Sequence, residues 1–421
     1  MKSQYIVLIV MIWISSSCEK QEELSFQRDA EGVITSMPYQ WKTSLSEDGN
    51  LISGFIHSSV TYQGNALFAA QKKGKDGSTL VMLSGKNGEV LWEFDDFYEQ
   101  HKKFFSIRDL YQPEENLIFQ EGKQFYHLNL VSGSTVHKAN KDYRIARMSG
   151  LKNQYFIAGN FISNQDELFD GGVFSGDISY SQTDMLFKPE FNRSFPGASN
   201  EIGVVGSVEA FQEEIGDIIL TYDYSTRNAN AVDTYAGLYN YTKAEHIYDK
   251  QPLALGIDSY GSGKPVIYDN KIYYSPGRTI VCLDLYTGDQ VWKKEFDQGF
   301  TFSGFILADD KIIANNEDTY LYALDPNTGS QLWKTKSSGT SSRMTHMNGV
   351  VYFTGGGDGL LHAVEIETGK HLWRIRSPDL TINRGAWFKD VVRVVPSNQN
   401  GNKGKVMVSS YLSAFCYEAA R

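Results

Sequence analysis

Hydrophobic and polar residues alternate in short runs along most of this chain, and the runs are separated by clusters of turn-forming residues. The C-terminal half shows the pattern most clearly: TYLYALD (319–325) leads into PNTG, and QLWKTK (331–336) leads out. A period of two that is broken by Pro, Asn and Gly is typical of antiparallel strands joined by tight turns. The pattern therefore predicts a β-hairpin over residues 319–336.

Four residues hold fixed places around this turn, namely Ala323, Asp325, Gly329 and Trp333. Pro presets φ at the first corner, Gly accepts positive φ, and the Asp carboxylate can accept backbone N–H groups within the turn. The same spacing recurs before and after this hairpin. The recurring sets are Cys282, Asp284, Gly288 and Trp292, and Ala363, Glu365, Gly369 and Trp373.

Weaker copies of the set extend the repeat toward the N-terminus. MLSGKNGEVLW (82–92) supplies Gly88 and Trp92, while 127–137, 177–187 and 238–248 end in His137, Phe187 and Tyr248. Successive copies are separated by 40 residues (333 to 373) up to 61 residues (187 to 248). A repeat of about 40–50 residues with several strands in each unit is typical of a β-propeller.

The two ends of the chain complete the count of repeats. Two more strand-like runs precede the good copies, as in RMTHMNG and VVYFTGG (343–356), which gives four strands per repeat. KVMVSSYLSAFCYEAAR (405–421) stops halfway through the motif after Cys416, and MPYQWKTSL (37–45) supplies the missing Trp41. Seven internal copies and one split copy predict an all-β, eight-bladed propeller of four-stranded antiparallel blades. An N-terminal strand closes its last blade and removes an open sheet edge.

The N-terminus has the features of an export signal. MKSQ precedes an apolar run, YIVLIVMIWI (5–14), which is too short to span a bilayer as a helix. SSSC (15–18) then resembles the lipobox of bacterial lipoproteins, whereas the simpler alternative is a secreted protein with an incidental cysteine. We expect a signal peptide at 1–17, lipidation of Cys18, a flexible tether at 18–36 and one propeller domain at 37–421.

The remaining cysteines, Cys282 and Cys416, occupy the same position of the motif three blades apart. A disulfide needs Cα atoms within about 7 Å. Both are therefore predicted to be free, buried packing residues.

Composition narrows the class of partner. The chain is 41% hydrophobic and 21% charged, with a net charge of −10 and a pI near 5.4. An acidic protein without a basic run lacks the surface that nucleic acid or anionic lipid headgroups attract. We expect no nucleic-acid partner, and contact with a membrane only through the N-terminal lipid.

The spacing A-x-D-x-x-x-G-x-x-x-W resembles the tryptophan-docking motif of the pyrroloquinoline-quinone (PQQ) type of eight-bladed propeller. Near-perfect copies end at Trp292, Trp333 and Trp373, and a fair copy ends at Trp92. The resemblance implies that each Trp stacks on the next blade near the small residue. The family contains quinoprotein dehydrogenases and non-catalytic lipoproteins such as the outer-membrane assembly factor BamB.

The sequence contains none of several common catalytic and metal-binding motifs. Quinoprotein dehydrogenases carry adjacent cysteines, Ca²⁺ ligands and long insertions, but this chain has no Cys-Cys pair, no CxxCH and no HExxH, GxSxG or EF-hand pattern. GSGKP (261–265) departs from the phosphate-loop pattern, and DELFDGG (166–172) is expected to be a solvated loop. His137, His246, His346, His362 and His371 are scattered over different repeats. No catalytic residue, cofactor or metal site is predicted.

The sequence therefore favours a non-catalytic, lipid-anchored scaffold of the cell envelope that binds envelope proteins, similar to BamB and acting as a monomer within a complex at the outer membrane. Candidate partner surfaces are the connections 192–203 and 224–237, or an axial funnel lined by Arg343, His346 and Arg384. KQEE (20–23) resembles a surface-export tag, which keeps a glycan- or nutrient-handling role at the cell surface open. The alternative is a PQQ-dependent dehydrogenase that oxidises an alcohol or sugar with the help of Ca²⁺.

Overall fold

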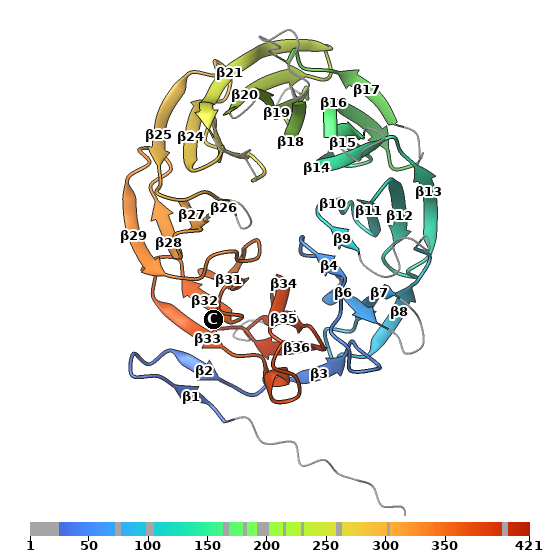
Figure 1. Cartoon of the computed structure of the whole chain (residues 1–421), viewed down its shortest axis with the longest axis vertical. Coiled ribbons are helices and arrows are strands. Elements are labelled where there is room, and N and C mark those ends of the chain that lie inside the picture. The colour runs from blue at the N-terminus through green and yellow to red at the C-terminus, as the bar shows by residue number, and fades with distance from the viewer. Residues whose placement is uncertain are drawn as a thin grey trace, which may run out of the picture.

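The computed structural model forms a ring of eight four-stranded antiparallel sheets around a central axis, which confirms the predicted fold (Figure 1). It describes residues 25–71, 77–97, 105–162, 168–179, 183–191, 202–213, 216–228, 231–257, 263–300, 304–397 and 403–421. The predicted signal peptide, Cys18 and KQEE lie outside these residues, as does most of 192–203. No helix among the described residues is long and apolar enough to cross a membrane.

Blades 1 to 4 follow one another in chain order, and each runs from an innermost to an outermost strand. Blade 1 comprises β5 (Thr61–Tyr62), β6 (Asn65–Gln71), β7 (Ser78–Leu83) and β8 (Val90–Phe94). Blade 2 comprises β10 (Leu110–Tyr111), β11 (Asn116–Glu121), β12 (Gln124–Asn129) and β13 (Thr135–Asn140). Blade 3 comprises β14 (Tyr143–Leu151), β15 (Gln154–Ile162), β16 (Leu168–Asp177) and β17 (Thr183–Phe187). Blade 4 comprises β18 (Ile202–Gln212), β19 (Ile218–Asn228), β20 (Ala231–Asn240) and β21 (Glu245–Ile257).

Blades 5 to 7 are shorter and more regular. Blade 5 comprises β22 (Val266–Tyr268), β23 (Lys271–Tyr274), β24 (Thr279–Asp284) and β25 (Gln290–Glu295). Blade 6 comprises β26 (Phe305–Ala308), β27 (Lys311–Asn316), β28 (Tyr320–Leu324) and β29 (Gln331–Lys336). Blade 7 comprises β30 (Thr345–Met347), β31 (Val350–Thr354), β32 (Leu361–Glu365) and β33 (His371–Ile375). A short parallel pair, β4 (Phe55–Ile56) and β9 (Ser106–Ile107), lies between blades 1 and 2.

Blade 8 joins the two ends of the chain. Its inner strands are β34 (Phe388–Val395), β35 (Lys405–Ser410) and β36 (Ser413–Glu418), and its outer strand is β3 (Trp41–Ser44). β3 pairs antiparallel with β36 so that Trp41 faces Cys416, and Figure 1 shows the blue strand beside the red one. Lys42 Nζ also lies 2.7 Å from the buried Oδ1 of Asp379, within the 3-10 turn η2 (Pro378–Thr381). The predicted closure by an N-terminal strand is present.

An N-terminal hairpin extends blade 7 beyond its expected four strands. β1 (Gln27–Arg28) and β2 (Ile34–Ser36) pair with each other, and β2 lies parallel to β33 with Ile34 opposite Trp373. Arg374 Nη2 holds the hairpin turn through Asp29 at 2.6 Å and Glu31 at 2.9 Å. Within the range 18–36, expected to be a flexible tether, residues 27–36 therefore form a β-hairpin packed on the propeller.

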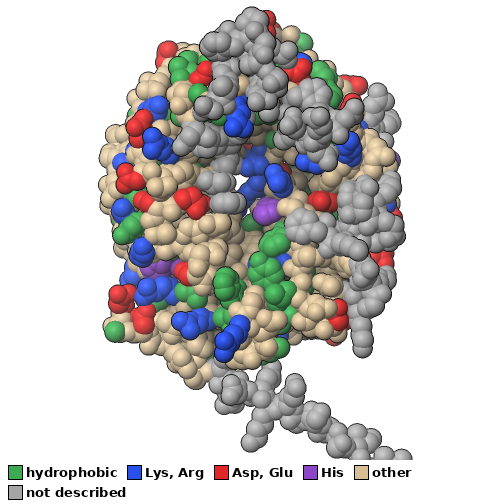
Figure 2. Space-filling view, viewed as in Figure 1, with side chains coloured by type: hydrophobic (Ala, Val, Ile, Leu, Met, Phe, Trp, Pro, Cys, Tyr) green, Lys and Arg blue, Asp and Glu red, His purple; other side chains and the backbone are tan. Residues whose placement is uncertain are grey.

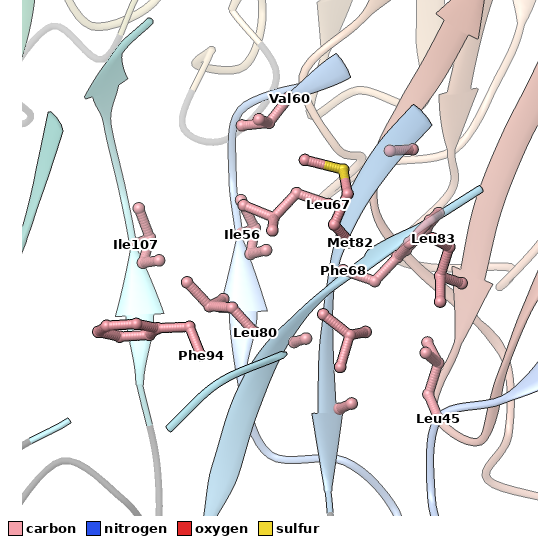
Figure 3. Packing of buried hydrophobic residues seen from close by; sticks show 14 of the residues in the cluster. Leu45, Ile56, Val60, Leu67, Phe68, Leu80, Met82, Leu83, Phe94 and Ile107 are labelled. Carbon is pink, nitrogen blue, oxygen red and sulfur yellow. The ribbon is translucent and has the colours of Figure 1, made fainter. Parts of the chain in front are cut away.

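The core fills the space between neighbouring blades. Both faces of a middle strand are covered, so β6 (NALFAAQ) and β7 (STLVML) are almost continuously buried instead of alternating. Figure 3 shows Leu67, Phe68 and Leu80 from these strands packed with Ile56 and Ile107 from the parallel pair β4 and β9. This packing holds the inner strands, and the side chains they present to the axis, in fixed positions.

Two expectations about the middle of the chain were wrong. Residues 224–237 are not a long connection, because Tyr224 pairs with Tyr235 within the extended strands β19 and β20. In the copy at 177–187 the strands form two more residue pairs between the aromatic residue and the turn than in the copy at 323–333, and Phe187 therefore faces Val173 instead of Asp177. Phe187 still packs on the next blade, with its ring centroid 4.5 Å from that of Tyr239.

Candidate functional site

The motif residues build the contact between neighbouring blades. Trp333 faces Ala323 across its own blade, and its indole lies over Gly369 of the next one. A Cβ at Gly369 would come within 2.7 Å of the ring, while indole Nε1 donates a hydrogen bond of 2.9 Å to the carbonyl of Ile366. The small residue therefore sits opposite the Trp in the same blade, and the glycine of the following blade receives the ring.

The same contact recurs around the ring. Trp41, Trp92 and Trp292 lie over Gly88, Gly133 and Gly329, and Tyr248 lies over Gly288. The indole nitrogens donate to backbone carbonyls three residues after the small position, which are those of Gly85, Leu130 and Pro326. Because Trp41 contributes one of these contacts, the docking continues across the junction of the chain ends.

The motif acids shape turns. Asp325 Oδ1 accepts the backbone N–H groups of Asn327 at 2.7 Å and Thr328 at 3.1 Å. Asp284 makes the equivalent bonds, and the bond from the backbone of Thr287 lowers its pKa. Glu365 instead accepts the Thr368 hydroxyl and pairs with Arg421. These carboxylates act in local structure and do not meet at a common site.

Cys282 and Cys416 are buried free thiols, as predicted from their shared motif position. Burial raises the pKa of each thiol to about 12. At neutral pH both side chains are therefore protonated and act as small packing groups.

A cluster of charged side chains occupies the axis, away from the docking motif. Asp109, which follows β9, is only 4% exposed. Its Oδ1 lies 3.1 Å from Arg343 Nη1, its Oδ2 lies 3.3 Å from Lys264 Nζ, and the Met148 N–H donates to it at 2.7 Å. Burial acts to raise the pKa of Asp109, but Lys264 and Arg343 outweigh it and hold the pKa at about 2. One ionised carboxylate thus joins segments of blades 2, 3, 5 and 7.

Further charged side chains surround Asp109. Burial lowers the pKa of Arg147 to about 10, and repulsion from Arg343 and Arg108 contributes to this shift. Burial also raises the pKa of Asp223 to about 7 and raises the pKa of Glu209. Among these three acids, Asp109 alone has a lowered pKa.

A cavity of about 480 Å³ opens beside the cluster, between the inner strands of blades 4 to 7. Its polar lining comes from Glu209, Lys264 and Arg343. Its apolar lining includes Phe211, Ile267, Phe305, Ile306 and Met344. Figure 2 shows an opening in the middle of the visible face, with Lys or Arg and His side chains around it.

Sequence reasoning placed Arg343 correctly at the axis, whereas His346 and Arg384 are exposed and do not line this cavity. It passed over Asp109 entirely and considered Lys264 only as part of GSGKP, which departs from the phosphate-loop pattern. Asp109 lies directly before the first strand of blade 2, and Lys264 lies two residues before that of blade 5. This position is the one local signal that could have marked them.

The charged groups at the axis do not form a divalent cation site. Among the described ranges, no three His, Cys, Asp or Glu side chains are grouped closely enough to hold a metal ion. Lys264 interacts electrostatically with both Asp109 and Glu209, so its ammonium already compensates the two carboxylates that a Ca²⁺ ion would need. The residues present therefore do not fit the Ca²⁺ that the quinoprotein branch uses.

Comparison with known proteins places the fold. A family model described as "Outer membrane protein assembly factor BamB" matches residues 260–335 and 317–402. No curated protein matches the chain as a relative. Within the C-terminal half the matched residues span blades 5 to 7 and part of blade 8, where the docking motif is most regular.

Several solved structures share the architecture at low sequence identity. BamB from Moraxella catarrhalis is 12% identical with a TM-score of 0.54, covering 90% of this chain and 97% of that one. The quinohemoprotein alcohol dehydrogenase from Comamonas testosteroni is 10% identical with a TM-score of 0.65, covering 90% of this chain and 76% of that one. The computationally designed Ika8 protein is 12% identical with a TM-score of 0.56, covering 89% and 99%. The chain is an eight-bladed propeller whose fold is similar to that of BamB, and its residues 260–402 match the BamB family model.

Proposed function

We propose that this protein is a non-catalytic, lipid-anchored propeller of the bacterial cell envelope that binds protein partners and serves outer-membrane protein assembly in a BamB-like role. The observation that carries the proposal is the match of blades 5 to 7 and part of blade 8 to the BamB family model. At the level of the family, this likeness supports a protein-binding scaffold. The lipobox-like SSSC at 15–18 supports attachment to a membrane through Cys18.

The non-catalytic part of the proposal is supported by what the motif side chains do. The indoles, glycines and acids of the docking motif are engaged in blade contacts and turns, and the two thiols are buried and protonated. The ionised carboxylate at the axis is compensated by Lys264 and Arg343. The function of a propeller depends on the residues that its fold presents and not on the fold itself. Here the motif residues make the ring rigid, which leaves the exposed loops to contact a partner.

Membrane attachment is tested by fractionating cells that express the wild-type protein, Cys18→Ser or Cys282→Ser. The wild type and Cys282→Ser are expected in the membrane fraction, and Cys18→Ser in the soluble fraction. Retention of Cys18→Ser in the membrane would refute lipid anchoring. Protease treatment of intact cells then separates the periplasmic face from the surface role in glycan or nutrient handling.

The partner is tested by crosslinking in intact cells followed by mass spectrometry. Components of the outer-membrane assembly machinery are expected among the crosslinked proteins, with contacts on propeller loops. Recovery of none of them, while the propeller itself is crosslinked efficiently, would contradict the assembly role.

The dehydrogenase alternative has its support in the likeness to quinohemoprotein alcohol dehydrogenases, which at this identity shows the fold alone. Adding PQQ with Ca²⁺ is expected to give neither a thermal shift nor dye reduction with alcohols or sugars. A shift together with dye reduction would overturn the non-catalytic proposal.

A further inference from the structure

We propose that the axial cavity between blades 4 and 7 is a binding site for an apolar carboxylate, in which Arg343 and Lys264 hold the carboxylate group and Phe305, Ile306 and Met344 surround the apolar body. This site is independent of the proposed role in assembly. It lies on the axis of the ring and not on its outer loops.

The cavity has the size and lining of a small-ligand site. Its volume of about 480 Å³ falls within the range of about 300–1,000 Å³ typical of such sites. Its walls come from β18, β22, β26 and the segment before β30, which are held by the packed blades behind them. The site is therefore preformed, so a ligand would lose little affinity to ordering of the protein.

The polar end of the cavity favours an anion. Arg343 uses Nη1 for both of its hydrogen bonds among the described residues, to Asp109 Oδ1 at 3.1 Å and to Ser58 Oγ at 3.0 Å. A guanidinium has five N–H donors in a planar fork, so the other edge can pair with a carboxylate. Lys264, 3.3 Å from the other oxygen of Asp109, places a second cation at the same wall. Asp109 and Glu209 balance the charges of Arg343 and Lys264, so the attraction for a carboxylate rests on the unused N–H donors of the Arg343 guanidinium.

Glu209 also lines the cavity, and its carboxylate has a hydrogen-bond partner in blade 3. Glu209 lies near Lys264 and accepts a hydrogen bond from the Ser149 side chain. The backbone N–H of the next residue, Ala210, also donates to Ser149 Oγ at 3.0 Å. Glu209 is thereby drawn toward blade 3, while Arg343 belongs to blade 7.

The apolar end requires a hydrophobic body on the ligand. Phe305 and Met344 are buried, and Ile306 and Phe211 are half-buried, so this wall offers no further charged group to a polar ligand. Burial of an apolar body here removes apolar surface from water and so favours binding. The chemistry fits a free aromatic or branched acid, and it equally fits an apolar C-terminal residue of a polypeptide.

The test measures binding to the full-length protein in detergent by isothermal titration calorimetry, with the detergent blank subtracted. The probes are 3-phenylpropionate and its amide, and acetyl-Ala-Ala-Phe with a free or amidated C-terminus. Because a charge-assisted hydrogen bond is lost in the amides, at least one acid is expected to bind about tenfold or more tightly than its amide. If only 3-phenylpropionate binds more tightly than its amide, the ligand is a small molecule. If acetyl-Ala-Ala-Phe with a free C-terminus binds more tightly than its amidated form, the ligand is the C-terminus of a polypeptide.

Three variants locate the site. Arg343→Gln is expected to weaken acid binding about tenfold and leave amide binding unchanged, since it removes the charge but keeps a polar side chain. Ile306→Trp fills the apolar end and is expected to weaken acid and amide alike, and it keeps the test valid if Arg343→Gln fails to fold. Arg384→Gln, on an exposed loop, is the matched control and leaves all affinities unchanged. Equal affinity for acids and amides, or acid binding that survives both cavity variants, would overturn the proposal.

Discussion

Docking of Trp333 on Gly369 can be measured as a coupling between two substitutions. Trp333→Ala removes an indole that is partly buried and makes one hydrogen bond to the Ile366 carbonyl. Large aromatic truncations cost about 3–5 kcal/mol, and partial exposure places this one near the lower end, at about 3 kcal/mol. Gly369→Ala adds a Cβ at φ +73°, within 2.7 Å of the indole. We expect about 1–2 kcal/mol for the left-handed backbone and a further 1–3 kcal/mol for overpacking.

The costs of Trp333→Ala and Gly369→Ala should not add. The overpacking cost of Gly369→Ala exists only while the Trp333 indole is present. In the Trp333→Ala background, Gly369→Ala should cost only about 1–2 kcal/mol, which gives a coupling of about 1–3 kcal/mol. Gly49→Ala is the matched control, since Gly49 has φ +75° and no atom within 4 Å of the added Cβ. Its cost alone and in the Trp333→Ala background should be the same.

Urea unfolding followed by tryptophan fluorescence and circular dichroism measures the four free energies, and calorimetric Tm values provide a second reading. Strict additivity of Trp333→Ala and Gly369→Ala would refute the docking account. A Gly49→Ala cost as large as that of Gly369→Ala would refute it as well, because the steric contribution would then be absent.

Three further outcomes follow from buried groups. Alkylation without reductant, followed by mass spectrometry, should label neither Cys282 nor Cys416 in the folded protein and should label both after denaturation. If both stay unlabelled after denaturation, the two thiols are not free. Burial raises the folded-state pKa of Asp223 to about 7, so stability should fall as pH rises from about 4 to 7, by up to roughly 1.4 kcal/mol per pH unit. Asp223→Asn should flatten this part of the profile in urea titrations at each pH, and an unchanged slope would argue against it. Lys42→Met should destabilise by about 3 kcal/mol, because Asp379 is left buried without its cation, and a wild-type Tm would show that the pair is unimportant.

The ring could be predicted from the sequence because its signal is local and repeated. The small residue, acid, glycine and Trp of one repeat lie within a single hairpin, so their spacing is visible without knowledge of any distant contact. The same holds for closure, since Trp41 and Cys416 are the two halves of one hairpin motif and face each other in the structure. The copy at 177–187 misled because its strands form two more residue pairs between the aromatic residue and the turn than the copy at 323–333, which shifts the partner of Phe187 from Asp177 to Val173.

The axial cluster could not be predicted in the same way. Asp109, Lys264 and Arg343 come from three blades and share no spacing, because what brings them together is the closure of the ring. The N-terminal hairpin did leave a local signal: Asp29 accepts the N–H groups of Glu31 and Val33, as expected of an Asp before a glycine-containing turn. Its docking on β33, however, depends on a strand more than three hundred positions away and has no counterpart in the pattern.

The pairing of β3 with β36 also sets the order in which the molecule can be completed. Trp41 is synthesised long before Cys416, so this contact has a very high sequence separation, and such contacts form late. Blade 8 is therefore expected to assemble only after the other seven blades, and β3 remains unpaired until β36 is available. In chains that stop before β36, the edges of β3 and β35 that face β36 would both remain open. The junction thus acts as a length check, since only chains that extend through β36 can seal the ring.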